Sequence, residues 1–337
     1  MQTPRNTTHE LILVTGSAGH LGEAIMRTLQ SQGRRARGID IQASAFTSAV
    51  GSITDEAFVR GQLRDVTAVV HCATLHKPHV ETHGAREFVD TNITGTLILL
   101  ERSVRAGVRS FIYTSTTSAF GSALSPPDGA PAAWVTENTT PIPRNIYGVT
   151  KAAAEGVCEM VHRRDGLPVI VLRAARFFPE PDDDPVIRSA FSVANVQVNE
   201  LLYRRADIAD VVDAHLLAIE RAPAIGFGRY IISATTPFTQ NDLLELRHAM
   251  PDVVRRYAPE ADAVFAERGW RLFAGIDRVY VNELARRELG WRPMYDFAYA
   301  ISRLREGDDH RSELARTIGA KGYHAAHPAS GAYSYRT

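Results

Sequence analysis

The stretch Leu11-Ile12-Leu13-Val14-Thr15-Gly16-Ser17-Ala18-Gly19-His20-Leu21-Gly22 decides the fold. A short apolar run, typical of a buried strand, leads directly into three glycines spaced three residues apart. Apolar residues then recur at helical spacing up to Leu29, and Gly33 ends the predicted helix. A strand that turns through glycines into a helix is the opening unit of a parallel α/β sheet.

Outward from this unit, short β-branched runs keep alternating with helical patterns as far as about residue 175. The predicted strands are 37–41, 68–72, 110–114 and 168–172, and the predicted helices are 55–63, 86–105 and 147–162. The alternation predicts an α/β fold, a Rossmann-type doubly wound parallel sheet covered by helices on both faces.

The alternation breaks after residue 175. Residues 179–185 are acidic and proline-rich, 207–220 and 229–233 predict a helix and a strand, and no clear pattern follows 239. We therefore expect a Rossmann domain over 9–176 and about 205–235, with a smaller C-terminal substrate-binding lobe over 177–204 and 236–305. A loosely ordered tail is expected over 319–337 because it has no hydrophobic period.

The composition narrows the class of protein. The 337 residues carry 38 Lys+Arg and 38 Asp+Glu, a formal net charge of +0, which favours neither nucleic acid nor a membrane surface as partner. The two cysteines, Cys72 and Cys158, lie in apolar segments and are expected to be free thiols. The polar start of the chain and the lack of an apolar run of about 20 residues predict a cytoplasmic protein.

The glycine loop predicts a dinucleotide site. Gly16 makes the turn, Gly19 lets the backbone approach a pyrophosphate, and Gly22 lets the helix pack on the strand, while the helix N-terminus offers free N–H groups. Asp40 ends the second predicted strand, where a carboxylate can bind ribose hydroxyls and repel a 2′-phosphate. Ile41 follows it and supplies no cation, so the sequence favours NAD over NADP.

A second group of residues indicates proton transfer. Tyr147 and Lys151 lie four residues apart on a predicted helix and therefore share one face. A nearby ammonium favours the phenolate and lowers the pKa of a tyrosine, which could then take a proton from a substrate hydroxyl while hydride leaves its carbon. Residues 115–118 form a hydroxyl cluster after a predicted strand, where parallel sheets carry their sites.

Together these motifs resemble the extended short-chain dehydrogenase/reductase family, and more narrowly its NAD-dependent epimerase/dehydratase branch, over about residues 9–305. The motifs are Gly16-x-x-Gly19-x-x-Gly22, Phe111-Ile112-Tyr113-Thr114-Ser115-Thr116 with Ala119-Phe120-Gly121, and Tyr147-x-x-x-Lys151. Supporting pieces are His71-Cys72-Ala73, Asn92-Ile93-Thr94-Gly95-Thr96, Asp207-Ile208-Ala209-Asp210-Val211 and Glu288-Leu289-Gly290-Trp291-Arg292-Pro293.

The resemblance implies roles for single residues. Tyr147 would be the general base, Lys151 would bind the nicotinamide ribose, and Thr116 would be the catalytic hydroxyl. Asn92 would lie near the cofactor in a supporting role, and either Ser52 or Asp55 would meet the adenine. The full expected cofactor-binding set is Gly16, Ala18, Gly19, His20, Leu21, Gly22, Asp40, Ile41, Ser52, Ile53, Cys72, Ala73, Thr74, Asn92, Thr114, Ser115, Tyr147, Lys151 and Ala174.

The expected substrate-binding residues are His76, Thr116, Thr117, Arg176 and Arg204. Arg176 stands where sugar-nucleotide epimerases usually have Asn. The arginines could hold a carboxylate or phosphate, or form ion pairs with acidic neighbours such as 182–184. No metal site is expected, because the histidines near 71–83 lack ligand spacing.

The reaction stays open between two readings. Dehydratases of the branch follow the catalytic Thr with an Asp-Glu pair, and Thr117 and Ser118 cannot replace it. A sugar or nucleotide-sugar epimerase, or a dehydrogenase/reductase of a small anionic substrate, both fit, whereas a non-catalytic sensor would not need Tyr147 and Lys151. The resemblance also implies a homodimer formed through two helices per subunit, for which the helices from 86 and from 147 are the candidates. Their outward faces carry Ala152, Ala153, Val157 and Met160, which suit such an interface and equally suit packing within the chain.

Overall fold

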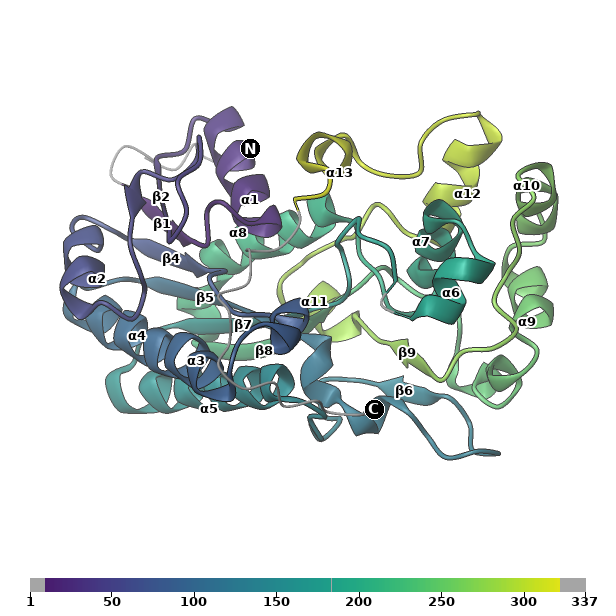
Figure 1. The fold of residues 1–337 in the computed structure, drawn as a ribbon, viewed down its shortest axis with the longest axis horizontal. Helices are drawn as coiled ribbons and strands as arrows, with labels where there is room; N and C mark the ends of the chain where they lie inside the picture. The colour runs from purple at the N-terminus through teal and green to yellow at the C-terminus, as the bar shows by residue number, and fades with distance from the viewer. Residues whose placement is uncertain (1–9, 183, 322–337) are drawn as a thin grey trace.

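The computed structural model describes residues 10–182 and 184–321. Its centre is a seven-stranded sheet in the order β3-β2-β1-β4-β5-β7-β8 with every neighbouring pair parallel (Figure 1). The strands are β1 Ile12–Thr15, β2 Ala36–Asp40, β3 Ala49–Val50, β4 Ala68–His71, β5 Ser110–Thr116, β7 Val169–Ala174 and β8 Phe227–Ile232. The expected doubly wound Rossmann-type sheet is confirmed.

Helices cover both faces of the sheet, as Figure 1 shows. One face packs against α1 (His20–Ser31) and α8 (Ile208–Ile225), and the other packs against α2 (Glu56–Gln62), α4 (Thr96–Arg105) and α5 (Ile146–Asp165). Alternate residues of each strand feed these two apolar layers. The layers fix where each strand ends, and therefore where the loops that follow the strands must lie.

A smaller lobe lies beside the carboxyl ends of the strands. Its apolar core is formed largely by α7 (Val193–Leu201), α9 (Met250–Tyr257), α10 (Ala261–Glu267) and α12 (Phe297–Arg305). A two-stranded parallel sheet, β6 (Ala133–Val135) with β9 (Arg278–Tyr280), belongs to this lobe. The remaining helices are α3 Ala85–Phe88, α6 Pro185–Ala190, α11 Glu283–Glu288 and α13 Glu313–Ile318.

Two predicted elements differ from the structure in ways that bear on the site. The helix expected over 86–105 is α3, a π-helical segment at Val89–Gly95 and α4 in succession, so one wide turn interrupts the α-helical pattern. Strand β5 extends two residues beyond the predicted end, because Ser115 and Thr116 continue the parallel pairing with Arg173 and Ala174 of β7. The hydroxyl cluster therefore begins on the strand itself.

Among the described residues, no helix combines the length and apolar character that crossing a membrane requires.

Candidate active site

The predicted site residues come together in one cleft of about 960 Å3 at the carboxyl ends of β1, β2, β4, β5 and β7. Every residue of the expected cofactor and substrate sets lines this cleft except Asn92. Ligand sites of open parallel sheets lie at this edge, because the connections on either side of the switch in strand order leave a crevice there.

The glycine loop has the geometry that a pyrophosphate needs. Gly16 has φ +73°, and a Cβ on Gly22 would lie 1.9 Å from the carbonyl oxygen of Gly16, so neither position tolerates a side chain. Gly19 is the N-cap of α1 and no side chain caps that helix. The free N–H groups of the first turn therefore stay available to an anion in the cleft, and the loop fits the phosphates of NAD.

Asp40 is fixed at the end of β2. Its two carboxylate oxygens each accept one backbone hydrogen bond, from the N–H of Ala18 and from the N–H of Gln42, both at 2.9 Å. The neighbouring cleft residues Ile41 and Ser52 carry no charge. Asp55 accepts from the N–H of Phe58 as the N-cap of α2 and does not line the cleft, so of the two residues expected to meet the adenine only Ser52 lines it.

Thr116, Tyr147 and Lys151 converge from β5 and α5. The Thr116 hydroxyl hydrogen-bonds to Tyr147. The Lys151 ammonium donates to the Thr114 carbonyl at 2.5 Å and lies 4.2 Å from the ring centre of Tyr113. Tyr147 is 8% exposed and Lys151 is 2% exposed, so this group of side chains is almost dry while still forming part of the cleft wall.

Without a bound ligand, burial is the largest influence on the pKa values of Tyr147 and Lys151. It raises the pKa of Tyr147 to about 12, against the hydrogen bond from Thr116. It lowers the pKa of Lys151 to about 8, against the carboxylate of Glu155. The direction at Tyr147 is opposite to the lowering expected from a neighbouring ammonium. Bringing it to about 8 would require roughly 5 kcal/mol, which only further positive charge in the cleft could supply.

Asn92 does not line the cleft, although it was included in the expected cofactor-binding set, and its contacts fit the supporting role that the resemblance implies. It is buried in the π-helical segment, where its side chain accepts from the Leu75 N–H at 2.8 Å and from the Thr74 hydroxyl at 2.9 Å. Its amide donates to the Leu75 carbonyl and to Thr150 on α5. Asn92 therefore ties the loop after β4 to the helix that carries Tyr147, and it does not line the cleft.

The two predicted substrate arginines already have acidic partners. Arg176 and Arg204 both pair with Asp182, at 2.9 Å and 2.8 Å, and Arg204 also pairs with Glu200 at 2.6 Å. Of the alternatives left open by the sequence, the intrachain ion pairs are the ones observed. Both residues nevertheless line the cleft.

Several residues that line the cleft were not predicted from the sequence. Arg278 and Tyr280 come from β9, Phe178 and Glu180 come from the acidic proline-rich loop, and Lys321 comes from the C-terminal segment. The ring of Phe178 stacks on the predicted substrate residue His76 with centroids 5.7 Å apart. No local pattern marks these residues, since each reaches the cleft only through the packing of the lobe.

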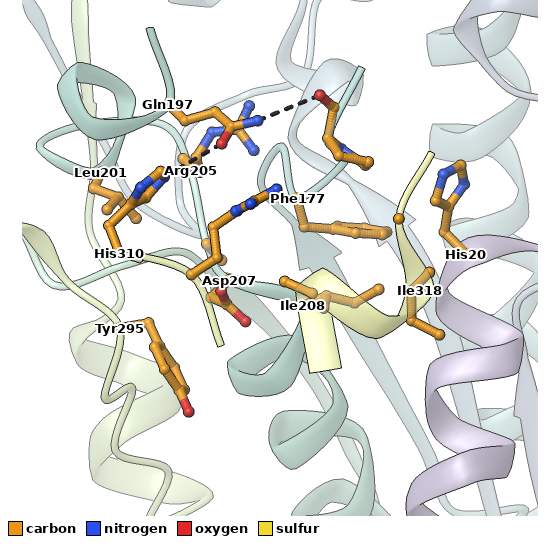
Figure 2. A pocket seen from close by; sticks show the side chains of 15 residues that line it. His20, Phe177, Gln197, Leu201, Arg205, Asp207, Ile208, Tyr295, His310 and Ile318 are labelled. Carbon is orange, nitrogen blue, oxygen red and sulfur yellow. Dashed lines mark hydrogen bonds between the residues drawn. The ribbon is translucent and has the colours of Figure 1, made fainter. Parts of the chain in front are cut away.

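Figure 2 shows a second, much smaller cavity of about 40 Å3, between α8, α13 and the lobe. Arg205, Gln197 and His310 lie along one side of it, and Ile208 and Ile318 lie along another. The volume holds a few water molecules and no sugar or nucleotide. Among residues 10–182 and 184–321, no cluster of three or more His, Cys, Asp or Glu side chains is arranged to hold a metal ion.

A parallel Rossmann sheet with an open glycine loop, an acidic residue after its second strand and a buried Thr–Tyr–Lys group defines a dinucleotide-dependent class of protein. The model of the NAD dependent epimerase/dehydratase family matches residues 12–232. The chain therefore belongs to this family, which confirms the resemblance stated from its motifs and NAD as the family's cofactor.

Similar proteins of known name extend over almost the whole chain. It is 28% identical to a dTDP-glucose 4,6-dehydratase of Streptomyces antibioticus, with 87% of this chain and 90% of the other covered. It is 24% identical to a UDP-glucose 4-epimerase of Streptomyces lividans, covering 94% and 96%. A short-chain dehydrogenase/reductase superfamily protein of Agrobacterium tumefaciens, solved with bound NAD, has the same fold, with TM-score 0.62, 23% identity and coverage of 91% and 99%.

Proposed function

We propose that this chain is an NAD-dependent epimerase or related oxidoreductase acting on a sugar or nucleotide-sugar carbinol, with Tyr147 as the general base. The observation that carries the proposal is the convergence of Thr116, Tyr147 and Lys151 in the same cleft as the glycine loop. A sensor or scaffold would have no use for a buried tyrosine and a buried lysine there, since both are costly to ionise.

When bound, NAD supplies the carbon that accepts a hydride. The proton is transferred by residues of this chain. The hydroxyl groups of Thr116 and Tyr147 orient the substrate oxygen, and Tyr147 takes its proton. Lys151, fixed by the Thr114 carbonyl, keeps a positive charge near the developing phenolate and stabilises it, because both side chains are buried.

Epimerisation is the reaction we favour within this proposal. The similarity to a UDP-glucose 4-epimerase covers nearly the whole chain. The similarity to a dTDP-glucose 4,6-dehydratase is of the same order, but Thr117 and Ser118 after Thr116 cannot serve as the acid and base of an elimination. The alternative is an NAD-dependent dehydrogenase or reductase of a small anionic substrate. The arginines at the substrate end, Arg176, Arg204 and Arg278, favour it.

The test compares the wild-type protein with Tyr147→Phe on a panel of sugars, nucleotide sugars and uronates. We expect turnover to fall by about 10²–10⁴-fold, because the proton acceptor is lost, while NAD affinity changes little. Tyr113→Phe is the matched control. Its buried hydroxyl has no hydrogen-bond partner among the described residues, and a phenyl ring can still face Lys151.

The outcomes separate the candidate functions. An inverted sugar with no net NADH supports epimerisation, and stoichiometric NADH supports the dehydrogenase. Wild-type turnover in Tyr147→Phe would refute the assigned base. NAD binding with no turnover of any panel member, in wild type and Tyr147→Phe alike, would favour a sensor.

A further inference from the structure

The C-terminal segment after α12 is anchored across the Rossmann domain. The Ser312 N–H and hydroxyl donate to the two carboxylate oxygens of Asp207 at 3.0 and 2.6 Å. Buried His310 meets Gln197 at 3.3 Å on the wall of the small cavity, and α13 then packs beside α1 and α8 (Figures 1 and 2). Gly319, with φ +57°, turns the chain toward the glycine loop.

This route brings Lys321 to the rim of the NAD cleft, which its side chain helps to line. Its ammonium donates to the carbonyl of Ala18 at 3.1 Å and pairs with the carboxylate of Glu23. Its backbone N–H donates to the ring of His20 at 3.2 Å and to Glu180 at 3.4 Å. His20 and Glu180 are themselves 2.9 Å apart, so three distant segments meet over the start of α1.

Glu23 brings a negative charge to this meeting point. It lies in the first turn of α1, one residue after the last glycine of the loop, and is 8% exposed. Burial opposes its ionisation, yet hydrogen bonds from Lys321 and Arg27 outweigh that effect and hold the pKa of the carboxyl below its ordinary value. An ionised carboxylate there would repel the dinucleotide phosphates that the same helix turn attracts.

We propose that Lys321 is a cofactor-binding residue, which neutralises Glu23 and places a positive charge beside the dinucleotide pyrophosphate. Lys321 lies at the rim of the cleft beside the glycine loop, where its ammonium is placed to retain a bound dinucleotide. The proposal rests on the family's use of NAD and is independent of Tyr147 and of the substrate.

The test measures NADH binding and dissociation by fluorescence in the full-length chain, without substrate. Lys321→Ala is expected to weaken NADH binding about tenfold, mainly through faster dissociation, since one charge-assisted contact is lost. Glu23→Gln in the Lys321→Ala background is expected to recover most of that loss, because it removes the carboxylate whose charge Arg27 alone would then have to offset. The double-mutant cycle isolates the coupling between the two side chains.

Arg316→Ala is the matched control. It removes the same unit charge from exposed α13, where Arg316 donates to the carbonyl of Arg311 and lies away from the cleft. We expect wild-type NADH binding from it. An affinity of Lys321→Ala within twofold of wild type would overturn the proposal, as would a double variant no tighter than Lys321→Ala alone. Absence of NADH binding in the wild type would instead refute the cofactor assignment. The result is distinct from that of the Tyr147→Phe test, in which turnover is lost while NAD binding remains.

Discussion

Tyr147 and Lys151 are both buried beside the cleft, and each must carry a charge during the proposed reaction. Both are destabilised in their charged forms by burial, which raises the pKa of Tyr147 to about 12 and lowers that of Lys151 to about 8. The four-residue spacing predicted that they would share a helix face, and they do. The sign of the shift at Tyr147 could not be predicted, because it depends on how much water the lobe and β5 exclude.

We therefore expect Lys151 to give the proposed activity an alkaline limit. Its charged form, present below its pKa of about 8, favours the Tyr147 phenolate, and that support is lost as the pH rises through this value. We expect turnover of the wild type to fall as the pH rises through about 8. The midpoint of this fall should lie at or somewhat below pH 8, because a bound cationic nicotinamide lowers the pKa of Lys151 further. The measurement is a pH profile of kcat at saturating substrate.

Lys151→Arg is the informative variant for this limit, because a guanidinium remains charged throughout the range. Its turnover is expected to be lower at pH 7, since the fork does not fit the contact with the Thr114 carbonyl, but to lack the alkaline decline. An alkaline limb at the same pH in both proteins would assign the limit to another group.

At the scale of elements, local sequence patterns predicted the helices and strands whose residues contact one another within a short stretch of the chain. The strands and helices of the sheet, apart from the two-residue β3, were predicted because strands and helices differ in the period of their apolar residues. The β6–β9 pair was missed because its partners, Ala133–Val135 and Arg278–Tyr280, meet only through the tertiary fold. The π-helical segment was missed because one wide turn leaves the apolar period nearly intact. Such turns gather at functional sites, and here the turn buries Asn92.

Strand β4 and helix α4 are joined through a buried neutral histidine. The ring of His71 lies 2.8 Å from the Thr15 hydroxyl and 3.0 Å from the Thr96 hydroxyl, and burial lowers its pKa to about 3. The unfolded chain therefore binds the extra proton between about pH 3 and 6.5, and the free energy of unfolding falls as the pH drops through that window. At pH 5 the loss should be about 2 kcal/mol from His71 alone.

Chemical unfolding of wild type and His71→Gln at pH 7.5 and pH 5 measures this contribution. The variant should be less stable at pH 7.5, and the gap should shrink by about 2 kcal/mol at pH 5, because glutamine does not titrate. His248→Gln, at an exposed position, is the control and should show the same gap at both values. A gap for His71→Gln that is independent of pH would show that its ring is not held neutral.

At the scale of the whole molecule, the cleft is assembled from segments that no local pattern connects. The glycine loop and the Tyr–Lys pair were found from spacing and chemistry. Glu180, Arg278 and Lys321 were not, since they reach the cleft from the acidic loop, from β9 and from the C-terminal segment. The part of the cleft that we propose holds NAD was therefore predictable, whereas the part contributed by the lobe depends on how the lobe packs. The predicted tail over 319–337 is described only to Lys321, and the rest of it lies outside the described residues.

We expect the protein to assemble as a homodimer through α5. Val149, Ala153, Gly156 and Met160 form an exposed, mostly apolar stripe at helical spacing, and Val149 and Met160 are 47% and 40% exposed. Ala152 and Val157, predicted to face outward, are only half-buried at its edge. A stripe of small side chains lets a second helix approach closely, and its burial between two copies would stabilise a dimer.

Gly156→Arg tests this interface without disturbing the monomer. A Cβ at Gly156 would meet no atom within 4 Å, so the new side chain should occupy only the space needed by a partner helix. Gly61→Arg on α2 is the control, since a Cβ there also has open space. Light scattering should give twice the 37.1 kDa of the chain for wild type and Gly61→Arg, and a monomer for Gly156→Arg. A monomeric wild type would refute the dimer, and a dimeric Gly156→Arg would move the interface to another face, because an arginine in the centre of the stripe could not be buried unpaired.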